Sequence, residues 1–230
     1  MITVRDLSIH CGDRSMDSVS LEVADGEIYF LLSRADRCGD PLFRVLGGMD
    51  APAAGEVFYN GRPAADWRKA PPVVFIDRVE DVAGFETEAR LGDWFDFLCR
   101  GSGLDRASIF KTLLVCNFHE RNLKKKVRDL APDVFKQAYL AACMAPDHDN
   151  IVINDFIRGA EKDFELKFNK LLLQKKNQGR AILSLGNDIF YASEIADRVG
   201  FVKKGRLLFE AGAADLKEMD IKDLYHTFLN

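Results

Sequence analysis

Residues 28–48, with the sequence IYFLLSRADRCGDPLFRVLGG, decide the fold of this chain. The run opens with five apolar or aromatic residues, which is typical of a strand buried on both faces. A polar, turn-rich stretch follows at 33–40, and residues 41–46 then predict a helix. Pro41 suits the first turn of this helix, Asp40 is expected to be its N-cap, and the glycine pair would end it. A strand, a loop and a helix in this order form half of a βαβ unit.

The rest of the chain continues the alternation of strands and helices. Two strands are expected before residue 24, and a hairpin turn at Asp25-Gly26 should connect the second of them to the run that begins at residue 28. A further strand closes with an Asn60-Gly61 turn. The remaining predicted elements are strands at 73–76, 151–153, 181–185, 199–202 and 207–209, and helices within 86–130 and at 133–144 and 162–176. This order predicts an α/β fold with a mainly parallel sheet.

Composition and charge narrow the functional classes. The chain has 230 residues, of which 47% are apolar and 30% are charged, so a well-packed core is expected. The formal net charge of −4 argues against a general nucleic-acid binder. The apolar runs are too short to cross a bilayer, and no secretory leader is visible. Five cysteines without C-x-x-C spacing predict neither a zinc site nor a disulfide framework, so we expect a cytoplasmic protein without a bound metal.

The order and spacing of these segments resemble the ATPase domain of ATP-binding cassette (ABC) transporters, and the resemblance covers essentially the whole chain. The segments that carry it are Gly26-Glu27-Ile28, Val45-Leu46-Gly47-Gly48, Gly55-Glu56-Val57, Asn60-Gly61, Ala196-Asp197-Arg198-Val199 and Lys204-Gly205-Arg206. The resemblance is greatest to the ATPase subunits of export-type transporters. It implies a P-loop NTPase-like α/β fold with a mainly parallel sheet, an N-terminal antiparallel β subdomain and a helical subdomain.

The same resemblance implies a single domain over residues 1–230. Residues 1–85 and 146–230 would form the core with its β subdomain, and 86–145 would form the inserted helical subdomain. Cassette domains of this family work as head-to-tail dimers on membrane-spanning subunits. The resemblance therefore implies permease subunits as partners, and a homodimer or a heterodimer with an intact ABC ATPase subunit.

The positions that would bind phosphate depart from the family pattern G-x-x-x-x-G-K-[ST]. Ser33 stands for the first glycine, Cys38 for the last glycine, Gly39 for the lysine and Asp40 for the serine or threonine, while Asp36 adds a second negative charge. Loss of the lysine contact should cost about 2–3 kcal/mol, and each carboxylate should add roughly 1 kcal/mol of repulsion. The sum corresponds to about a thousandfold loss of nucleotide affinity.

The other functional motifs of the family depart from its pattern as well. The signature L-S-G-G-Q reads LAPDV here, which replaces the residues that approach phosphate with Ala131, Pro132 and Asp133. Asn154 stands at the position of the acidic residue that ends the second nucleotide-binding strand. Asp155 takes the catalytic glutamate position and is read as a residual acidic residue at a strand end. Asn187 takes the position of the switch histidine.

These departures predict a pseudo-ATPase: no catalytic residues, no bound ATP or magnesium, and a structural or regulatory role in a transport complex at the cytoplasmic face of the membrane. The candidates for docking to a partner are Arg78, Phe85 and an exposed aromatic residue such as Trp94. Two alternatives stay open at this point. One is a soluble protein-binding scaffold without a permease, and the other is a divergent ATPase that holds nucleotide by unfamiliar contacts.

Overall fold

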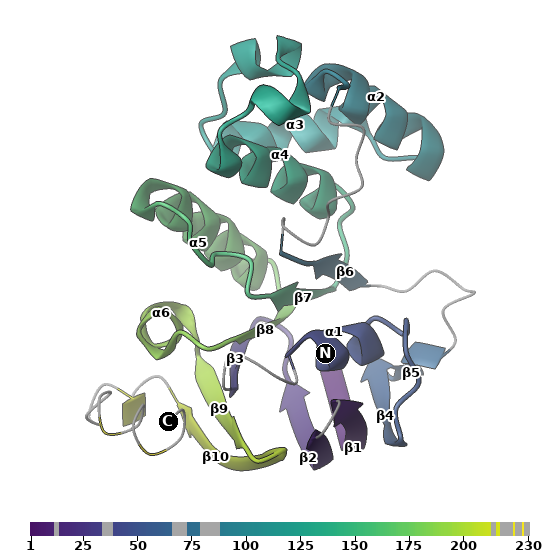
Figure 1. Ribbon diagram of the computed structural model, residues 1–230, viewed down its shortest axis with the longest axis vertical. Helices are drawn as coiled ribbons and strands as arrows, with labels where there is room; N and C mark the ends of the chain where they lie inside the picture. The colour runs from purple at the N-terminus through teal and green to yellow at the C-terminus, as the bar shows by residue number, and fades with distance from the viewer. Residues whose placement is uncertain are drawn as a thin grey trace. The chain divides into compact units, whose positions relative to one another are not determined.

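The computed structural model describes residues 1–11, 14–33, 39–65, 73–78 and 88–212, with Asp215, Leu216, Asp223 and Thr227 of the C-terminal tail. It has an α/β architecture with a four-stranded antiparallel sheet, a six-stranded mixed sheet and helices (Figure 1). The predicted fold class is confirmed.

The chain divides into two compact units. The first unit comprises Met1–Phe75, His148–Asp155 and Lys175–Asn230, and the helical unit comprises Ile76–Asp147 and Phe156–Gln174. The helical unit thus also takes in most of the helix at 162–177. The subdomain bounds of 86 and 145 stay a prediction.

The four-stranded sheet has the order β2-β1-β4-β5. Its strands are β1 (Ile2–Cys11), β2 (Arg14–Val23), β4 (Ala54–Tyr59) and β5 (Arg62–Pro63). In β2, buried Val19, Leu21 and Val23 alternate with exposed polar residues, as expected for an antiparallel sheet with one solvated face. The Asn60-Gly61 turn between β4 and β5 is confirmed, and both residues have positive φ.

A bulge interrupts β1 where it passes between β2 and β4. The register shifts on both sides of Asp6, whose φ is +45°. Across from it, Gly55 leaves no room for a side chain, because a Cβ there would lie 2.4 Å from the carbonyl oxygens of Arg5 and Asp6. Neighbouring hydroxyls satisfy the displaced backbone, since Asp6 N–H donates to Ser20 Oγ at 2.8 Å.

The six-stranded sheet has the order β10-β9-β3-β8-β7-β6. Its strands are β3 (Ile28–Ser33), β6 (Val73–Ile76), β7 (Asn150–Asn154), β8 (Ala181–Gly186), β9 (Arg198–Lys203) and β10 (Arg206–Gly212). The strand β3 is parallel to both β8 and β9, and β7 is parallel to β8, whereas β9 and β10 form an antiparallel hairpin. The strand predicted at 28–32 is therefore central and buried on both faces.

The turn at Asp25-Gly26 exists, but the prediction that it makes a hairpin is wrong. It connects β2 of one sheet to β3 of the other, and β2 pairs with β1 instead. The reason is the burial pattern of the two strands. The alternating pattern of β2 suits a half-solvated antiparallel sheet, while the uninterrupted apolar run of β3 suits the interior of a parallel sheet.

One core joins both sheets of the first unit. Helix α1 (Gly39–Leu46) contributes Leu42, Phe43, Val45 and Leu46 to a buried cluster that also includes residues from β1, β2, β3 and β8. Phe43 meets Phe75 edge-on, with 5.6 Å between the ring centroids. The position of α1 is therefore fixed by packing on both sheets.

The helical unit has its own core. Its helices are α2 (Leu91–Ser102), α3 (Arg106–Val115), the 3₁₀ turns η3 (Glu120–Lys124) and η4 (Val127–Asp129), α4 (Pro132–Met144) and most of α5 (Lys162–Asn177). Ile109, Leu113 and Cys116 are buried, and Ile109 and Leu113 pack in the core of the helical unit with residues of α2 and α4.

Candidate functional site at the carboxyl ends of the parallel strands

The parallel strands β3, β7 and β8 end at one edge of the sheet, the edge at which α/β proteins bind ligands. Ser33 is the last residue of β3 and is half-buried, and α1 begins at Gly39. Asp36 and Cys38 lie outside the described residues. The prediction that Asp40 is the N-cap is wrong, because α1 begins one residue earlier and Asp40 lies in its first turn.

The last residue of β7, Asn154, contacts the first turn of α1. Its side chain is 3% exposed, and its amide nitrogen Nδ2 donates to Asp40 Oδ1 at 3.0 Å. Asp40 itself is exposed. The sequence predicted that both positions belong to a lost nucleotide site, but nothing in it indicated that the two side chains would bind each other.

Asp155 follows β7 directly and has a left-handed backbone, with φ of +45°. Its N–H donates to the carbonyl oxygen of Leu185 at 2.9 Å, which holds the chain against β8 just beyond the ladder. An aspartate tolerates this conformation better than most residues. The carboxylate lies beside Gly186, since a Cβ on that glycine would be 3.7 Å from Asp155 Oδ1.

The segment after β8 begins a helix that the sequence analysis missed. Asn187 is half-buried at the bend, and Asp188 then caps α6 (Ile189–Ile195) by accepting the N–H of Tyr191 at 3.0 Å. An aspartate before an apolar run is an N-cap signal that could have found this helix.

In the helical unit, the α4 N-terminus carries the residues at the signature position. Ala131 is the N-cap without a side-chain hydrogen bond, and Pro132 is the first helical residue. Asp133 Oδ2 accepts the N–H of Glu161 at 3.0 Å, and buried Lys136 donates through Nζ to the carbonyl oxygen of Arg158 at 2.9 Å. The first turns of α4 are therefore tied to residues 158–161.

The three docking candidates differ in their exposure to solvent and in whether the structure describes them. The choice of Trp94 is wrong, because its side chain is 6% exposed and packs between the rings of Phe95 and Phe135 in the core of the helical unit. Phe97 on the same helix is 65% exposed instead. Arg78 is half-buried, and Phe85 lies outside the described residues.

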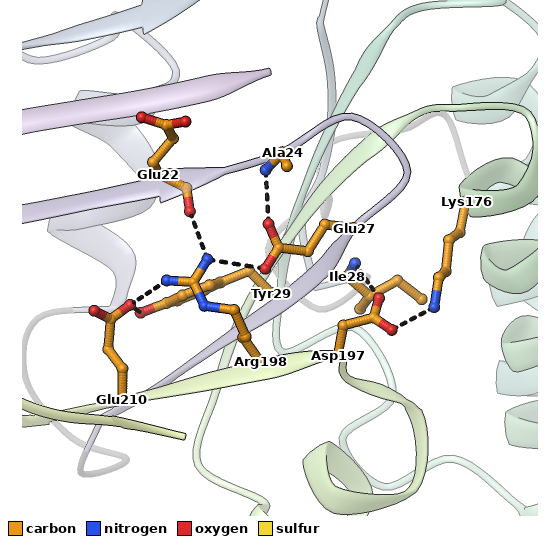
Figure 2. Close-up of polar contacts among 9 residues, drawn as sticks. All are labelled: Glu22, Ala24, Glu27, Ile28, Tyr29, Lys176, Asp197, Arg198 and Glu210. Carbon is orange, nitrogen blue, oxygen red and sulfur yellow. Dashed lines mark hydrogen bonds and ion pairs between the residues drawn. The ribbon is translucent and has the colours of Figure 1, made fainter. Parts of the chain in front are cut away.

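A polar network at the opposite end of β3 was also missed by the sequence analysis (Figure 2). Arg198 Nη1 donates to Glu27 Oε1 at 2.9 Å and to the carbonyl oxygen of Glu22 at 3.2 Å, and Nη2 donates to Glu210 Oε1 at 2.8 Å. The guanidinium also lies over the ring of Tyr29, 5.0 Å from its centroid. Four strands of the two sheets thus converge on one arginine.

Asp197 and Tyr29 complete this network. The Asp197 carboxylate accepts the N–H of Ile28 at 2.9 Å and also pairs with Lys176. Burial and the hydrogen bond to Glu210 raise the pKa of Tyr29 far above its usual range, so its hydroxyl stays protonated and donates to Glu210 at 2.7 Å. The Asp197-Arg198 pair lies in the segment that carried the family resemblance, which was the one signal for it.

None of the helices in the described residues has the length and apolar character needed to span a membrane. Within the same ranges, no group of three or more His, Cys, Asp or Glu side chains is placed to hold a metal ion.

Comparison with known proteins gives relatives over nearly the whole chain, although no family model matches it. A putative ABC transporter ATP-binding protein of Halobacterium salinarum is 24% identical over 222 residues, which cover 94% of this chain and 95% of that protein. A putative ABC transporter ATP-binding protein of Listeria monocytogenes is 24% identical over 216 residues, with 89% and 79% covered.

The solved structures agree on the fold. The ATP-binding subunit of an ABC transporter superposes with a TM-score of 0.82 at 16% identity, over 99% of this chain and 98% of that one. The structure of cbiO1 from Clostridium perfringens, part of the ABC transporter complex cbiONQ, gives 0.77 at 16% identity, over 98% and 93%. The fold and its sheet edge define a P-loop NTPase-type domain. Over nearly its whole length, the chain is similar to the ATP-binding proteins of ABC transporters.

Proposed function

We propose that this chain is a catalytically inactive ABC subunit that acts as a structural or regulatory component of a membrane transport complex. The observation that carries the proposal is the hydrogen bond from Asn154 to Asp40. P-loop NTPases hold Mg²⁺ through the serine or threonine of the phosphate loop and an aspartate after the second strand. Here those two positions hold an aspartate and an asparagine that bind each other.

The residues present do not fit a magnesium–nucleotide complex. Mg²⁺ needs oxygen ligands, whereas Asn154 presents an N–H to Asp40. Turning the amide over would set its oxygen against the Asp40 carboxylate, acceptor against acceptor. Gly39 has no side chain to replace the lysine that neutralises the terminal phosphates. Among the described residues at the ends of β3, β7 and β8 and at the start of α1, no lysine or arginine is present to stabilise the charge that develops during hydrolysis.

The partner side of the proposal follows from the family. The similar protein cbiO1 is part of the complex cbiONQ. We infer by analogy that this chain is cytoplasmic and binds membrane-spanning permease subunits, alone or with an intact ABC ATPase subunit, as a homodimer or a heterodimer. Arg78 and Phe85 are the residues we propose for docking, and the export-type assignment is part of the same proposal.

Nucleotide binding and hydrolysis test the inactive state directly. We expect the purified protein to release no phosphate from Mg-ATP, and its melting temperature to stay constant at millimolar Mg-ATP, since a ligand that binds the folded state must raise it. An intact ABC ATPase in the same assay is the control. A rise of several degrees would favour the divergent-ATPase alternative.

Affinity purification from detergent-solubilised native membranes tests the complex. Recovery of a multi-spanning protein with the tagged chain supports the proposed role. Recovery of non-membrane proteins alone would contradict it and favour the scaffold alternative.

A further inference from the structure

The contact between α1 and β7 is made by side chains that are far apart in the sequence. Asp40 and Asn154 are separated by 114 positions, and the 3.0 Å distance joins Asn154 Nδ2 to Asp40 Oδ1. Asn154 is 3% exposed, while Asp40 is exposed. Loss of this acceptor would remove a hydrogen bond that offsets the cost of burying the amide. The pair therefore stabilises the arrangement in which the first turn of α1 stays at the end of β7.

The negative charge of the pair lies on Asp40, which is the more favourable of the two positions for a carboxylate. Asp40 lies in the first turn of α1, where the helix dipole favours a negative charge, and it keeps access to water. A carboxylate at position 154 would be nearly fully buried and within hydrogen-bond distance of a second carboxylate, which is costly. The amide at 154 and the carboxylate at 40 thus match each other.

We propose that the Asn154–Asp40 hydrogen bond fastens α1 to the carboxyl end of β7 at the place where a P-loop ATPase uses a divalent cation. This inference rests on the proposed function. It assigns to the hydrogen bond the place that Mg²⁺ takes in an active ATPase, and the proposed inactive state does not bind Mg²⁺. The site is then a built structural contact rather than a remnant of an ATPase.

A double-mutant cycle with Asp40→Ala, Asn154→Ala and the double variant tests the contact through chemical unfolding. We expect the two substitutions to be coupled. The unfolding equilibrium constant of the double variant should then be about tenfold smaller than the two single effects together predict. Asp163→Ala is the matched control, because Asp163 is also an exposed aspartate in the first turn of a helix, where it pairs with half-buried Lys167 at 2.6 Å. Additive effects of Asp40→Ala and Asn154→Ala would overturn the proposal.

Magnesium chloride alone is the second probe, applied to the wild type and to Asn154→Asp. We expect Asn154→Asp to melt at a lower temperature than the wild type, and Mg²⁺ to restore part of that loss while leaving the wild type unchanged. If Mg²⁺ stabilises the wild type as strongly as the variant, the hydrogen bond does not take the place of the ion and the proposal is overturned. Binding of ATP by the wild type would refute the proposed function separately, whatever the cycle gives.

Discussion

At the scale of single residues, one arginine connects several strands of the first unit to one another. Arg198 contacts Glu27, Glu210 and the backbone of Glu22, and it stacks on Tyr29 (Figure 2). Its planar guanidinium holds donors on three nitrogens in a fixed geometry, whereas a lysine donates from a single nitrogen. Its neighbour in the hairpin, Gly200, has to be a glycine, since a Cβ there would lie 2.1 Å from the Tyr29 hydroxyl.

Replacing Arg198 tests this role. We expect Arg198→Ala to lower the free energy of unfolding by about 1–3 kcal/mol, a range that allows for the partial exposure of Arg198. The reason is that the buried Glu27 carboxylate would lose its ion pair with Arg198. Arg198→Lys should recover only part of the loss. Urea unfolding measures both. Arg128→Ala is the control, because the Arg128–Glu88 pair is exposed on both sides and its loss should change stability much less. Equal effects of the two alanine variants would contradict the assigned role.

Asp105 gives a prediction about pH. The hydrogen bond from the Ser108 hydroxyl, with those from the N–H groups of Ala107 and Ser108, holds the pKa of this N-cap carboxyl below its usual range. Since the folded-state pKa lies below the unfolded value of about 3.9, the stabilisation is present above that pH and is lost as the pH falls through the folded pKa.

Asp105→Asn keeps a capping oxygen but removes the charge that titrates. We expect the wild type to have the higher urea midpoint at pH 7, and the difference to shrink as the pH falls below about 4. Measurements across this range check the sign. A difference that is constant between pH 7 and pH 2 would show that the charge of Asp105 is not responsible.

At the scale of secondary-structure elements, the bulge in β1 is a feature that needs a particular residue on the next strand. Gly55 has φ of +83° and faces the carbonyl oxygens of Arg5 and Asp6 across the bulge. Gly61, at the far end of the same hairpin, has φ of +73° but nothing within 4 Å of a Cβ position. The two glycines share the backbone conformation and differ in the space around them.

Alanine at each glycine separates these two effects. We expect Gly61→Ala to cost only the left-handed strain, about 1 kcal/mol. Gly55→Ala should cost about 2–4 kcal/mol, because the added methyl group also collides with backbone that cannot move without breaking the β1–β4 pairing. Thermal and urea unfolding compare the variants. If the Gly55→Ala protein is no less stable than the Gly61→Ala protein, the close approach of Gly55 to the β1 backbone is not what requires glycine there.

At the scale of the whole molecule, the sequence predicted the elements well and the contacts between them poorly. Periodicity located β3, β7, β8 and the β9–β10 hairpin, because buried strands and turns have local signals. It misassigned the partner of β2 and placed Trp94 on the surface, since both depend on packing between distant segments. The Asn154–Asp40 contact joins two positions that the sequence treated as two separate losses.

The docking that we propose between the whole protein and a membrane partner can be tested at Arg78. We expect Arg78→Glu to reduce the amount of the chain recovered with membranes, because reversal of a charge at an interface opposes binding to a complementary surface. Arg62→Glu makes the same charge change on exposed β5 and should leave recovery unchanged. The melting temperature of each variant separates a docking defect from unfolding. If Arg78→Glu binds membranes as well as Arg62→Glu does, the docking surface is elsewhere, and the exposed Phe97 becomes the next position to change.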